Sequence, residues 1–229
     1  MKVLNLYAGI GGNRKLWKDV DVTAIEINPE IAKIYQDFFP DDKVVVADAH
    51  KYLLEHYKEF DFIWSSPPCP THSRMNYLQK AKGNKVIYPD MTLWQEIIFL
   101  KNWYKGKWIV ENVRTYYEPL IKPIEIDRHY FWNNFFIIPI EVCKKVRNDK
   151  GMTLNVKMKE RNMFVKDFYK YKGDKRTLLN NCIEPDLGKH ILECAKMVKC
   201  NDNECENNPF ECPFFVNGLC TEVNHKLKR

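Results

Sequence analysis

The chain has 229 residues and a formal net charge of +6, with 45% hydrophobic and 29% charged residues. This composition is typical of a globular protein with one main domain, and we find no internal repeat or low-complexity linker. No apolar run approaches the roughly 20 residues that a membrane helix requires, and no leader-like segment precedes the first strand-like run. We therefore expect a cytoplasmic protein, of a prokaryote or a virus-infected host cell, in which the eight cysteines are reduced.

The positive charge is concentrated between Lys144 and Arg176, where 12 Lys and Arg residues accompany 4 Asp and Glu residues. Four aromatic residues lie among these charges, at Phe164, Phe168, Tyr169 and Tyr171. A basic surface that carries aromatic side chains suits a polyanion with stackable bases, so nucleic acid is one interpretation. A solvated, lysine-rich insertion is the alternative.

Short apolar runs alternate with helix-like segments through the first 140 residues. The runs that we interpret as buried strands are 3–7, 22–25, 44–47, 60–64 and 108–110. Asn28 is placed to cap a helix with Pro29 in its first turn, and residues 91–104 predict a second amphipathic helix. This alternation predicts an α/β fold with a mostly parallel sheet.

The second half of the chain changes character. Residues 129–140 predict one or two further strands, with a hairpin around Asn133 and Asn134 that would form an antiparallel edge of the sheet. Residues 185–199 predict a helix, and the last thirty residues are rich in cysteine and loop-like.

Three successive strand ends carry residues suited to a nucleoside cofactor. The first strand runs into Ala8-Gly9-Ile10-Gly11-Gly12, where glycines allow a sharp turn and a close approach of the backbone to a ligand. Glu26 ends the second strand, where a carboxylate accepts hydrogen bonds from ribose hydroxyls. Asp48 ends the third and is placed to accept a hydrogen bond from an adenine amino group. Tight packing and solvated acids are the plainer alternatives, but the order of the three features favours a cofactor site.

A thiol follows the fourth strand. The segment Ser65-Ser66-Pro67-Pro68-Cys69-Pro70 presents Cys69 on a loop whose prolines restrict the backbone. The fifth strand brings Glu111 to the same edge of the sheet. A thiolate beside a carboxylic acid suits attack on an electron-poor ring that must be protonated to react. A buried structural thiol is the alternative for Cys69.

In this order the motifs resemble those of the S-adenosylmethionine-dependent cytosine-C5 DNA methyltransferases, in a minimal, phage-like form. The matching segments span residues 3 to about 198 and are, in chain order, 5–12, Glu26, Asp48, 67–69, 111–113, 128–130 and 179–183. The resemblance implies a Rossmann-like class I methyltransferase fold. The residues that it implies for binding S-adenosylmethionine are Tyr7, Ala8, Gly9, Gly11, Gly12, Glu26, Ile27, Asp48, Ala49, Pro67 and Asn181.

The resemblance also implies a reaction. Cys69 would add to C6 of cytosine while Glu111 is hydrogen-bonded at N3, and the methyl group would then pass to C5 to leave 5-methylcytosine. Arg128 would hold the O2 carbonyl, and Asn112 would orient Glu111 or the thiol loop. Because a stacked base is unreachable, the cytosine must be flipped out of the duplex, at a cost of about a few kcal/mol. We consider His72 a candidate contact to DNA phosphate.

These expectations divide the chain into four parts. They are a catalytic cofactor-binding domain (1–140), a short basic target-recognition region (141–178), a returning helix of the catalytic domain (179–199) and a cysteine-rich tail (200–229).

Some positions depart from the family pattern. Ile124 and Ile126 stand where the arginine motif has Gln and a further Arg, and Asn180 stands where the last motif has Gly. The roughly forty residues between Phe136 and Leu179 are few for the family's variable recognition region. We therefore predict relaxed or very short sequence recognition, or help from a partner protein.

The tail carries four thiols, at Cys200, Cys205, Cys212 and Cys220. Four thiolates suit a tetrahedral zinc site, with His225 as a substitute for one of them. The spacing lacks a C-x2-C knuckle, so reduced, unliganded cysteines are the alternative, and an iron–sulfur cluster is a third.

Three functions are compatible with these patterns. The first is a DNA (cytosine-5-)-methyltransferase, either a phage-like minimal form or a member of a restriction-modification system, with duplex DNA as its partner. The second is a tRNA methyltransferase of the same fold, and the third is a non-catalytic module that binds nucleic acid. The presence of both Cys69 and Glu111 argues against the third.

Overall fold

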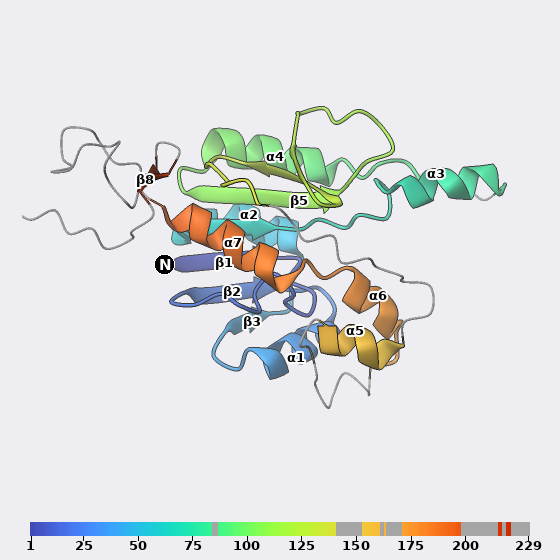
Figure 1. The fold of residues 1–229 in the computed structure, drawn as a ribbon, viewed down its shortest axis with the longest axis horizontal. Coiled ribbons are helices and arrows are strands. Elements are labelled where there is room, and N and C mark those ends of the chain that lie inside the picture. Colours follow the sequence, from blue (N-terminus) through green and yellow to red (C-terminus); the bar gives the residue numbers. More distant parts are fainter. Residues whose placement is uncertain are drawn as a thin grey trace, which may run out of the picture.

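The computed structural model describes residues 1–83, 87–140, 153–160, 163 and 171–197, and the backbone of two short strands at 215–216 and 219–220. A seven-stranded sheet with the order β3-β2-β1-β4-β5-β7-β6 lies at its centre (Figure 1). The strands are β1 (Lys2–Leu6), β2 (Asp21–Ile25), β3 (Lys43–Val45), β4 (Phe62–Ser65), β5 (Lys107–Val113), β6 (Ile124–Ile126) and β7 (His129–Asn133). Strands β1 to β5 pair in parallel, and β7 pairs antiparallel with both β5 and β6. The sequence-based prediction of a mostly parallel sheet with an antiparallel edge hairpin is thus confirmed.

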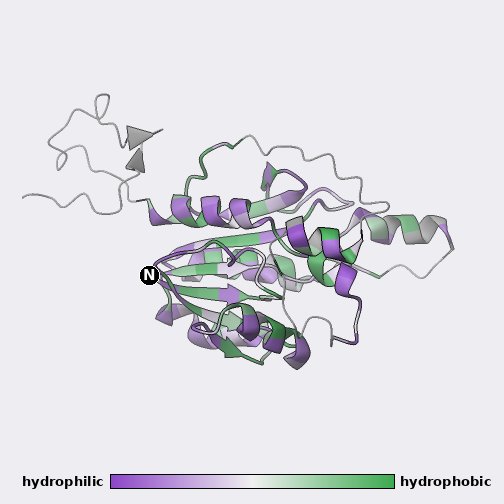
Figure 2. Ribbon diagram, turned by 60° about the horizontal axis from the view of Figure 1, so that its bottom comes forward, coloured by the Kyte–Doolittle hydropathy of each residue, from purple (hydrophilic) through white to green (hydrophobic). Residues whose placement is uncertain are grey.

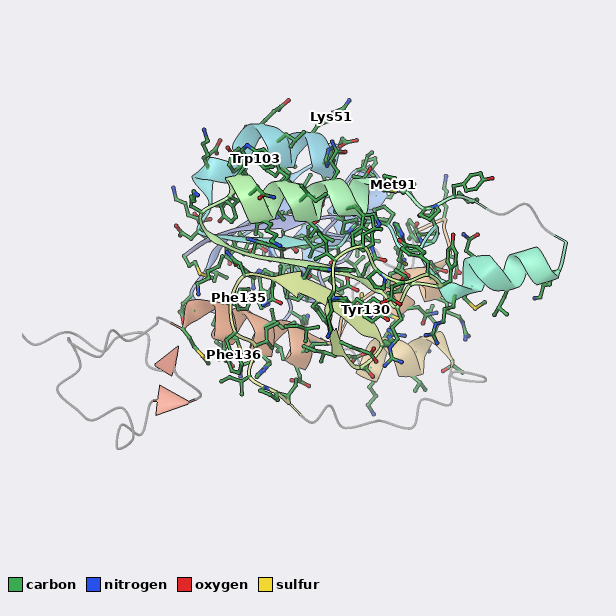
Figure 3. All side chains as sticks on the ribbon, turned by 90° about the horizontal axis from the view of Figure 1, so that it is seen from above. Lys51, Met91, Trp103, Tyr130, Phe135 and Phe136 are labelled. Atoms are coloured by element: carbon green, nitrogen blue, oxygen red, sulfur yellow. The ribbon has the colours of Figure 1, made fainter. Side chains whose placement is uncertain are left out.

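Helices cover both faces of this sheet. The helices of the described residues are α1 (Pro29–Phe38), α2 (Ala49–His56), α3 (Arg74–Ala81), α4 (Thr92–Trp103), α5 (Leu154–Glu160), α6 (Lys175–Asn180) and α7 (Pro185–Lys196), with a 3-10 turn at Tyr57–Glu59. Of these, α3 extends away from the sheet (Figure 1). Figure 3 looks along the sheet and shows α2 and α4, marked by Lys51 and Trp103, on one side and α7 on the other. The structure is therefore a three-layer α/β sandwich.

The alternation of side chains along the strands explains why helices pack on both faces of the sheet. In β1, Leu4 and Leu6 belong to the apolar cluster of α2 and α4, whereas Val3 belongs to that of α7. Successive side chains of a strand point to opposite faces, so a strand that is apolar at consecutive positions is buried on both. The hydropathy of these strands and helices can be followed in Figure 2.

Helix α1 begins where the sequence predicts. The Asn28 side chain accepts hydrogen bonds from the backbone N–H groups of Glu30 (2.9 Å) and Ile31 (3.3 Å), and Pro29 occupies the first turn. These bonds satisfy two of the four N–H groups that lack a partner inside the helix, which fixes its start.

The predicted hairpin around Asn133 and Asn134 is wrong. The reversal lies at Asp127 and Arg128, between β6 and β7, and Asp127 has a positive φ of 53°. Asn134 instead accepts a hydrogen bond from the Trp108 N–H (2.9 Å) and donates one to the Gly106 carbonyl (2.9 Å). The amide thus ends β7 against the beginning of β5, a role that turn propensity does not reveal.

The proposed zinc ligands cannot be placed from this structure. Cys200, Cys205, Cys212 and His225 lie outside the described residues, and of Cys220 only the backbone is described, in β9 (Leu219–Cys220), which pairs with β8 (Phe215–Val216). Within the described residues, no group of three His, Cys, Asp or Glu side chains is arranged to hold a metal ion. Most of the basic segment also lies outside this part, except for α5, α6 and the residues that lead into α6.

The described helices include none with the length and apolar composition needed to cross a membrane.

Gly11 offers a test of how the first loop packs against α1. A Cβ atom there would lie 2.2 Å from the Phe39 ring, and φ is +78°. We expect Gly11→Ala to lower the free energy of unfolding by about 2 to 4 kcal/mol, because backbone strain and overpacking add. Gly83→Ala is the matched control, since φ is +76° but nothing lies within 4 Å of the added Cβ, and it should cost only about 1 kcal/mol. Equal losses in urea denaturation would contradict this packing.

Candidate active site

A cavity of about 350 Å³ opens at the carboxyl ends of β1, β4 and β5. This volume lies in the range of about 300 to 1,000 Å³ that is typical of small-molecule sites. The segments that line it are Tyr7 to Ile10, Gly12, Asn13, Glu26, Ile31, Ser66 to Pro70, Glu111 to Val113, Arg128, His129, Leu178 and Asn180 to Ile183. Residues up to 176 positions apart in the sequence, Tyr7 and Ile183, therefore meet around one space.

The loop after β1 that contains Gly9, Gly11 and Gly12 (the glycine loop) turns sharply at the edge of this cavity. Both Tyr7 and Gly9 have φ of +55°, and the Gly11 N–H donates to the Ala8 carbonyl (2.9 Å). No atom lies within 4 Å of the place where a Gly9 Cβ would stand, so the backbone at Gly9 is open to a ligand. At Gly12 a Cβ would lie 2.6 Å from the Cys182 Cβ, so this glycine allows close contact with the segment after α6.

Glu26 joins this loop to α1. One carboxylate oxygen accepts the Gly9 N–H (3.0 Å) and the other accepts the Asn28 N–H (2.9 Å). The side chain is buried and lines the cavity. A carboxylate held in this way presents its remaining lone pairs to hydroxyl donors, the chemistry that the sequence predicts for a ribose.

Four of the residues predicted to bind cofactor do not line the cavity: Gly11, Ile27, Asp48 and Ala49. Gly11 packs against α1, and Ile27 is 67% exposed. Asp48 caps α2, where it accepts the Lys51 N–H (2.9 Å), and Ala49 is buried with the apolar residues of α2 and α4. The other predicted residues, Tyr7, Ala8, Gly9, Gly12, Glu26, Pro67 and Asn181, do line it.

Strand β5 anchors the loop that carries Cys69 (residues 66–70, the thiol loop). The Asn112 amide donates to the Pro67 carbonyl (3.0 Å) and is buried. Beyond Cys69, the Cys69 carbonyl accepts the N–H groups of His72 and Ser73, each at 3.0 Å. Anchors on both sides fix Cys69, which is half-buried on the wall of the cavity.

Glu111 lines the same cavity and is 8% exposed. Burial raises the pKa of Glu111 to about 7, although a hydrogen bond from Ser66 and the positive charge of Arg128 act in the opposite direction. Burial and the nearby Glu111 charge raise the pKa of the Cys69 thiol, which a backbone hydrogen bond and Arg128 lower. The Glu111 carboxyl therefore keeps its proton to a higher pH than an ordinary glutamic acid does.

Arg128 and His129 close the site from the edge hairpin. The Arg128 guanidinium donates to the Asn180 carbonyl (3.2 Å), so the hairpin turn contacts the end of α6 across the cavity. His129 Nε2 lies 3.7 Å from a Glu111 carboxylate oxygen. Antiparallel pairing of β5 with β7 places these two side chains on one face of the sheet.

The expectation that His72 contacts phosphate is wrong. Its side chain has no exposed surface, and its Nδ1 lies 2.6 Å from the Tyr117 hydroxyl. Polarity alone suggested a surface position, but the turn after Cys69 directs this ring into the protein.

Two residues near the site were missed in the sequence. Ser66 hydrogen-bonds Glu111, and Glu96 of α4 is wholly buried among hydroxyl groups. A signal for Glu96 was available, because an acid stands on the apolar side of an amphipathic helix between Leu93 and Leu100.

A larger recess of about 930 Å³ lies between α4 and the β6–β7 edge. Its lining includes Lys101, Lys107 and Lys122 but none of the residues predicted to bind cofactor or to take part in catalysis. Volume alone therefore does not locate the chemistry.

Comparisons with known proteins identify a matching family. The family model described as C-5 cytosine-specific DNA methylase matches residues 1–119. A Spodoptera frugiperda tRNA (cytosine(38)-C(5))-methyltransferase is 25% identical over 157 residues, which are 62% of this chain and 45% of the relative. The aligned region thus spans less than half of that relative's length.

Solved structures give partial matches. A Spodoptera frugiperda DNMT2 variant is 26% identical, with a TM-score of 0.36 over 49% of this chain and 35% of that one. A DNA modification methyltransferase from an E. coli prophage, described as putative, is 16% identical, with a TM-score of 0.40 over 58% and 46% of the two chains.

The strand order, the glycine loop and the strand-end acid define a Rossmann-like class of α/β fold with a ligand site at the carboxyl ends of its strands. Within that class, the chain belongs to the C-5 cytosine-specific DNA methylase family, since the family model covers more than half of it.

The raised pKa of Glu111 has a consequence for stability. Because the folded state holds this proton more tightly than the unfolded state, stability is greatest below the ordinary pKa of 4.5 and falls as pH rises to about 7. We expect Glu111→Gln to be more stable than the wild type by on the order of 3 kcal/mol at pH about 8, with the difference vanishing toward pH about 4.5. Urea denaturation across this pH range measures it, and a difference independent of pH would contradict the assignment.

Proposed function

We propose that this chain is an S-adenosylmethionine-dependent methyltransferase that modifies C5 of cytosine in a polynucleotide. The observation that carries the proposal is that Cys69, Glu111 and Arg128, which come from three separate loops and strands, line one cavity with the glycine loop. Family membership supports the same chemistry.

The residues of the cavity suit each step of this reaction. The Cys69 thiolate forms a bond to C6 of the ring, and protonated Glu111 donates a hydrogen bond to N3, where negative charge develops. Arg128 faces the same space and stabilises both the thiolate and the O2 carbonyl. Once C5 carries the methyl group, solvent takes the C5 proton and the C6–S bond breaks, so that Cys69 leaves as a thiolate and the ring is aromatic again.

The residues around the glycine loop fit the cofactor. S-adenosylmethionine supplies the methyl group, as a sulfonium, for transfer to C5. The open backbone at Gly9 and the buried Glu26 carboxylate would hold its nucleoside part. Asn181, at the end of α6, lies on the opposite wall of the cavity.

We propose DNA as the polymer, with tRNA as the second candidate. The family model that matches is one of DNA methylases, whereas the curated relative is named for a tRNA cytosine. In either polymer a paired base must be flipped into the cavity. The short stretch between β7 and α6 supports recognition of few bases, or recognition aided by a partner protein. We also propose the cytoplasm as the site of action.

Replacement of the nucleophile tests the chemistry. We expect Cys69→Ser to lower methyl transfer from tritiated cofactor by about 10³-fold or more, since a serine hydroxyl is a far weaker nucleophile than a thiolate. The dissociation constant for S-adenosylhomocysteine should stay within about twofold. Cys194→Ala, which removes a buried thiol of α7 outside the cavity, is the control. Turnover by Cys69→Ser at the control's rate would assign the nucleophile elsewhere.

Tritiated cofactor also tests whether DNA or tRNA is the substrate. We expect incorporation into duplex DNA, with modified positions confined to cytosine C5 when the product is mapped by bisulfite sequencing. Incorporation into tRNA alone would establish the second candidate. If neither polymer is labelled, in the presence of measured cofactor binding, the chain is a binding module and the proposal fails.

A further inference from the structure

Glu96 is a carboxylate without any exposed surface, in the middle of α4. Its neighbours on the helix, Leu93, Ile97 and Leu100, are fully buried apolar residues. An acid in such surroundings is costly unless strong donors surround it. Its position therefore calls for an explanation beyond packing.

Three donors from three separate elements meet this carboxylate. The Tyr7 hydroxyl donates to one oxygen (2.6 Å), the Ser65 hydroxyl donates to the other (2.6 Å), and His50 Nδ1 lies 3.1 Å from the first. Burial and the Glu96 charge raise the pKa of Tyr7, so the phenol remains a donor, and the hydrogen bond to Glu96 raises the pKa of His50.

Two of these donors, Tyr7 and Ser65, stand next to parts of the candidate active site. Tyr7 opens the glycine loop and lines the cavity. Ser65 ends β4, two residues before Pro67 and four before Cys69. His50 lies in the first turn of α2, directly behind the strand end that carries Asp48.

The contact between Tyr7 and Glu96 holds the backbone of Tyr7 in an unfavourable conformation. Its φ of +55° is rare for a bulky residue, for which the left-handed region is strained. Such strain persists only where the surroundings enforce it, and it is concentrated at functional sites. The short hydrogen bond to Glu96 anchors the far end of this side chain.

The two serines at the end of β4 extend the connection to the chemistry. Successive side chains face opposite sides of a strand. Ser65 accordingly reaches Glu96 on the α4 side, while Ser66 reaches Glu111 on the α7 side. The start of the thiol loop is thus anchored on both faces of the sheet, by the Ser65 hydroxyl on one face and by the Ser66 hydroxyl on the other.

We propose that Glu96 is a positioning residue that couples the glycine loop to the thiol loop, so that ligand binding at the first and the placement of Cys69 at the second depend on each other. This inference rests on the proposed function and adds to it. Coupling is reciprocal, so a change at the thiol-loop anchor must alter the affinity for a ligand of the glycine loop.

Calorimetric binding of S-adenosylhomocysteine, without nucleic acid, measures this coupling. We expect Ser65→Ala to weaken binding about fivefold or more, although Ser65 does not line the cavity. Glu96→Leu should weaken it at least as much, and adding Ser65→Ala to Glu96→Leu should have no further effect. Glu96→Gln keeps an acceptor oxygen and the volume, and should restore affinity to within about threefold of the wild type.

A second readout follows the thiol directly. Alkylation of Cys69 by iodoacetamide should slow when S-adenosylhomocysteine is added to the wild type, and this response should be lost in Ser65→Ala and in Glu96→Leu. Of the cysteines whose side chains the structure describes, Cys182 and Cys194 are buried. Mass spectrometry separates alkylation of Cys69 from alkylation of the other cysteines of the chain.

Ile97→Ala is the matched control, because Ile97 is the adjacent residue of α4 and equally buried. It should lower the melting temperature through cavity formation yet leave the dissociation constant within about twofold. If Ile97→Ala weakens binding as much as Glu96→Leu, or if folded Ser65→Ala binds like the wild type, Glu96 is only structural. Failure of the wild type itself to bind would instead overturn the proposed function.

Discussion

Parallel pairing of β1, β4 and β5 is the constraint on which the site depends. Leu6 pairs with Ser65, and Ser65 pairs with Val110, so the residues that follow these three positions lie at the same level of the sheet. The loops that follow them must then meet at one edge of the sheet, as ligand sites do in open α/β folds. A slip of one residue in β4 or β5 would turn Ser66 and Glu111 to opposite faces and dismantle the cavity.

Burial at this edge creates an electrostatic conflict between two groups. The same desolvation raises the pKa of both Cys69 and Glu111, yet the proposed reaction needs the thiol without its proton and the carboxyl with it. A charged Glu111 opposes the thiolate, whereas a protonated one removes that repulsion, so the two titrations are coupled. Arg128 favours the charged form of each group and so does not by itself decide which one holds the proton.

Local patterns in the sequence predicted much of the framework. The Asn28 cap, the parallel strands and the meeting of Cys69 with Glu111 were all accessible, because each follows from short-range periodicity or from the position of a residue at a strand end. Strand β6 was missed since it has only three residues and follows Pro123.

Roles that depend on distant partners were not accessible. Glu96 contacts Tyr7 and Ser65, which are 89 and 31 positions away, and His72 reaches Tyr117, 45 positions away. Asp48 shows a different difficulty, since the same carboxylate at a strand end suits a cofactor contact and a helix cap equally well. Only the geometry of the folded chain separates such alternatives.

Helix α7 has a consequence for how the protein is made. It covers the sheet face formed by Val3, Phe62 and Trp64, although it lies at residues 185–196. The ribosome therefore synthesises all the strands of the seven-stranded sheet before it synthesises the helix that covers this face. Throughout this interval the nascent chain displays an uncovered apolar sheet, which makes it a natural client for chaperones and prone to aggregate when elongation stalls.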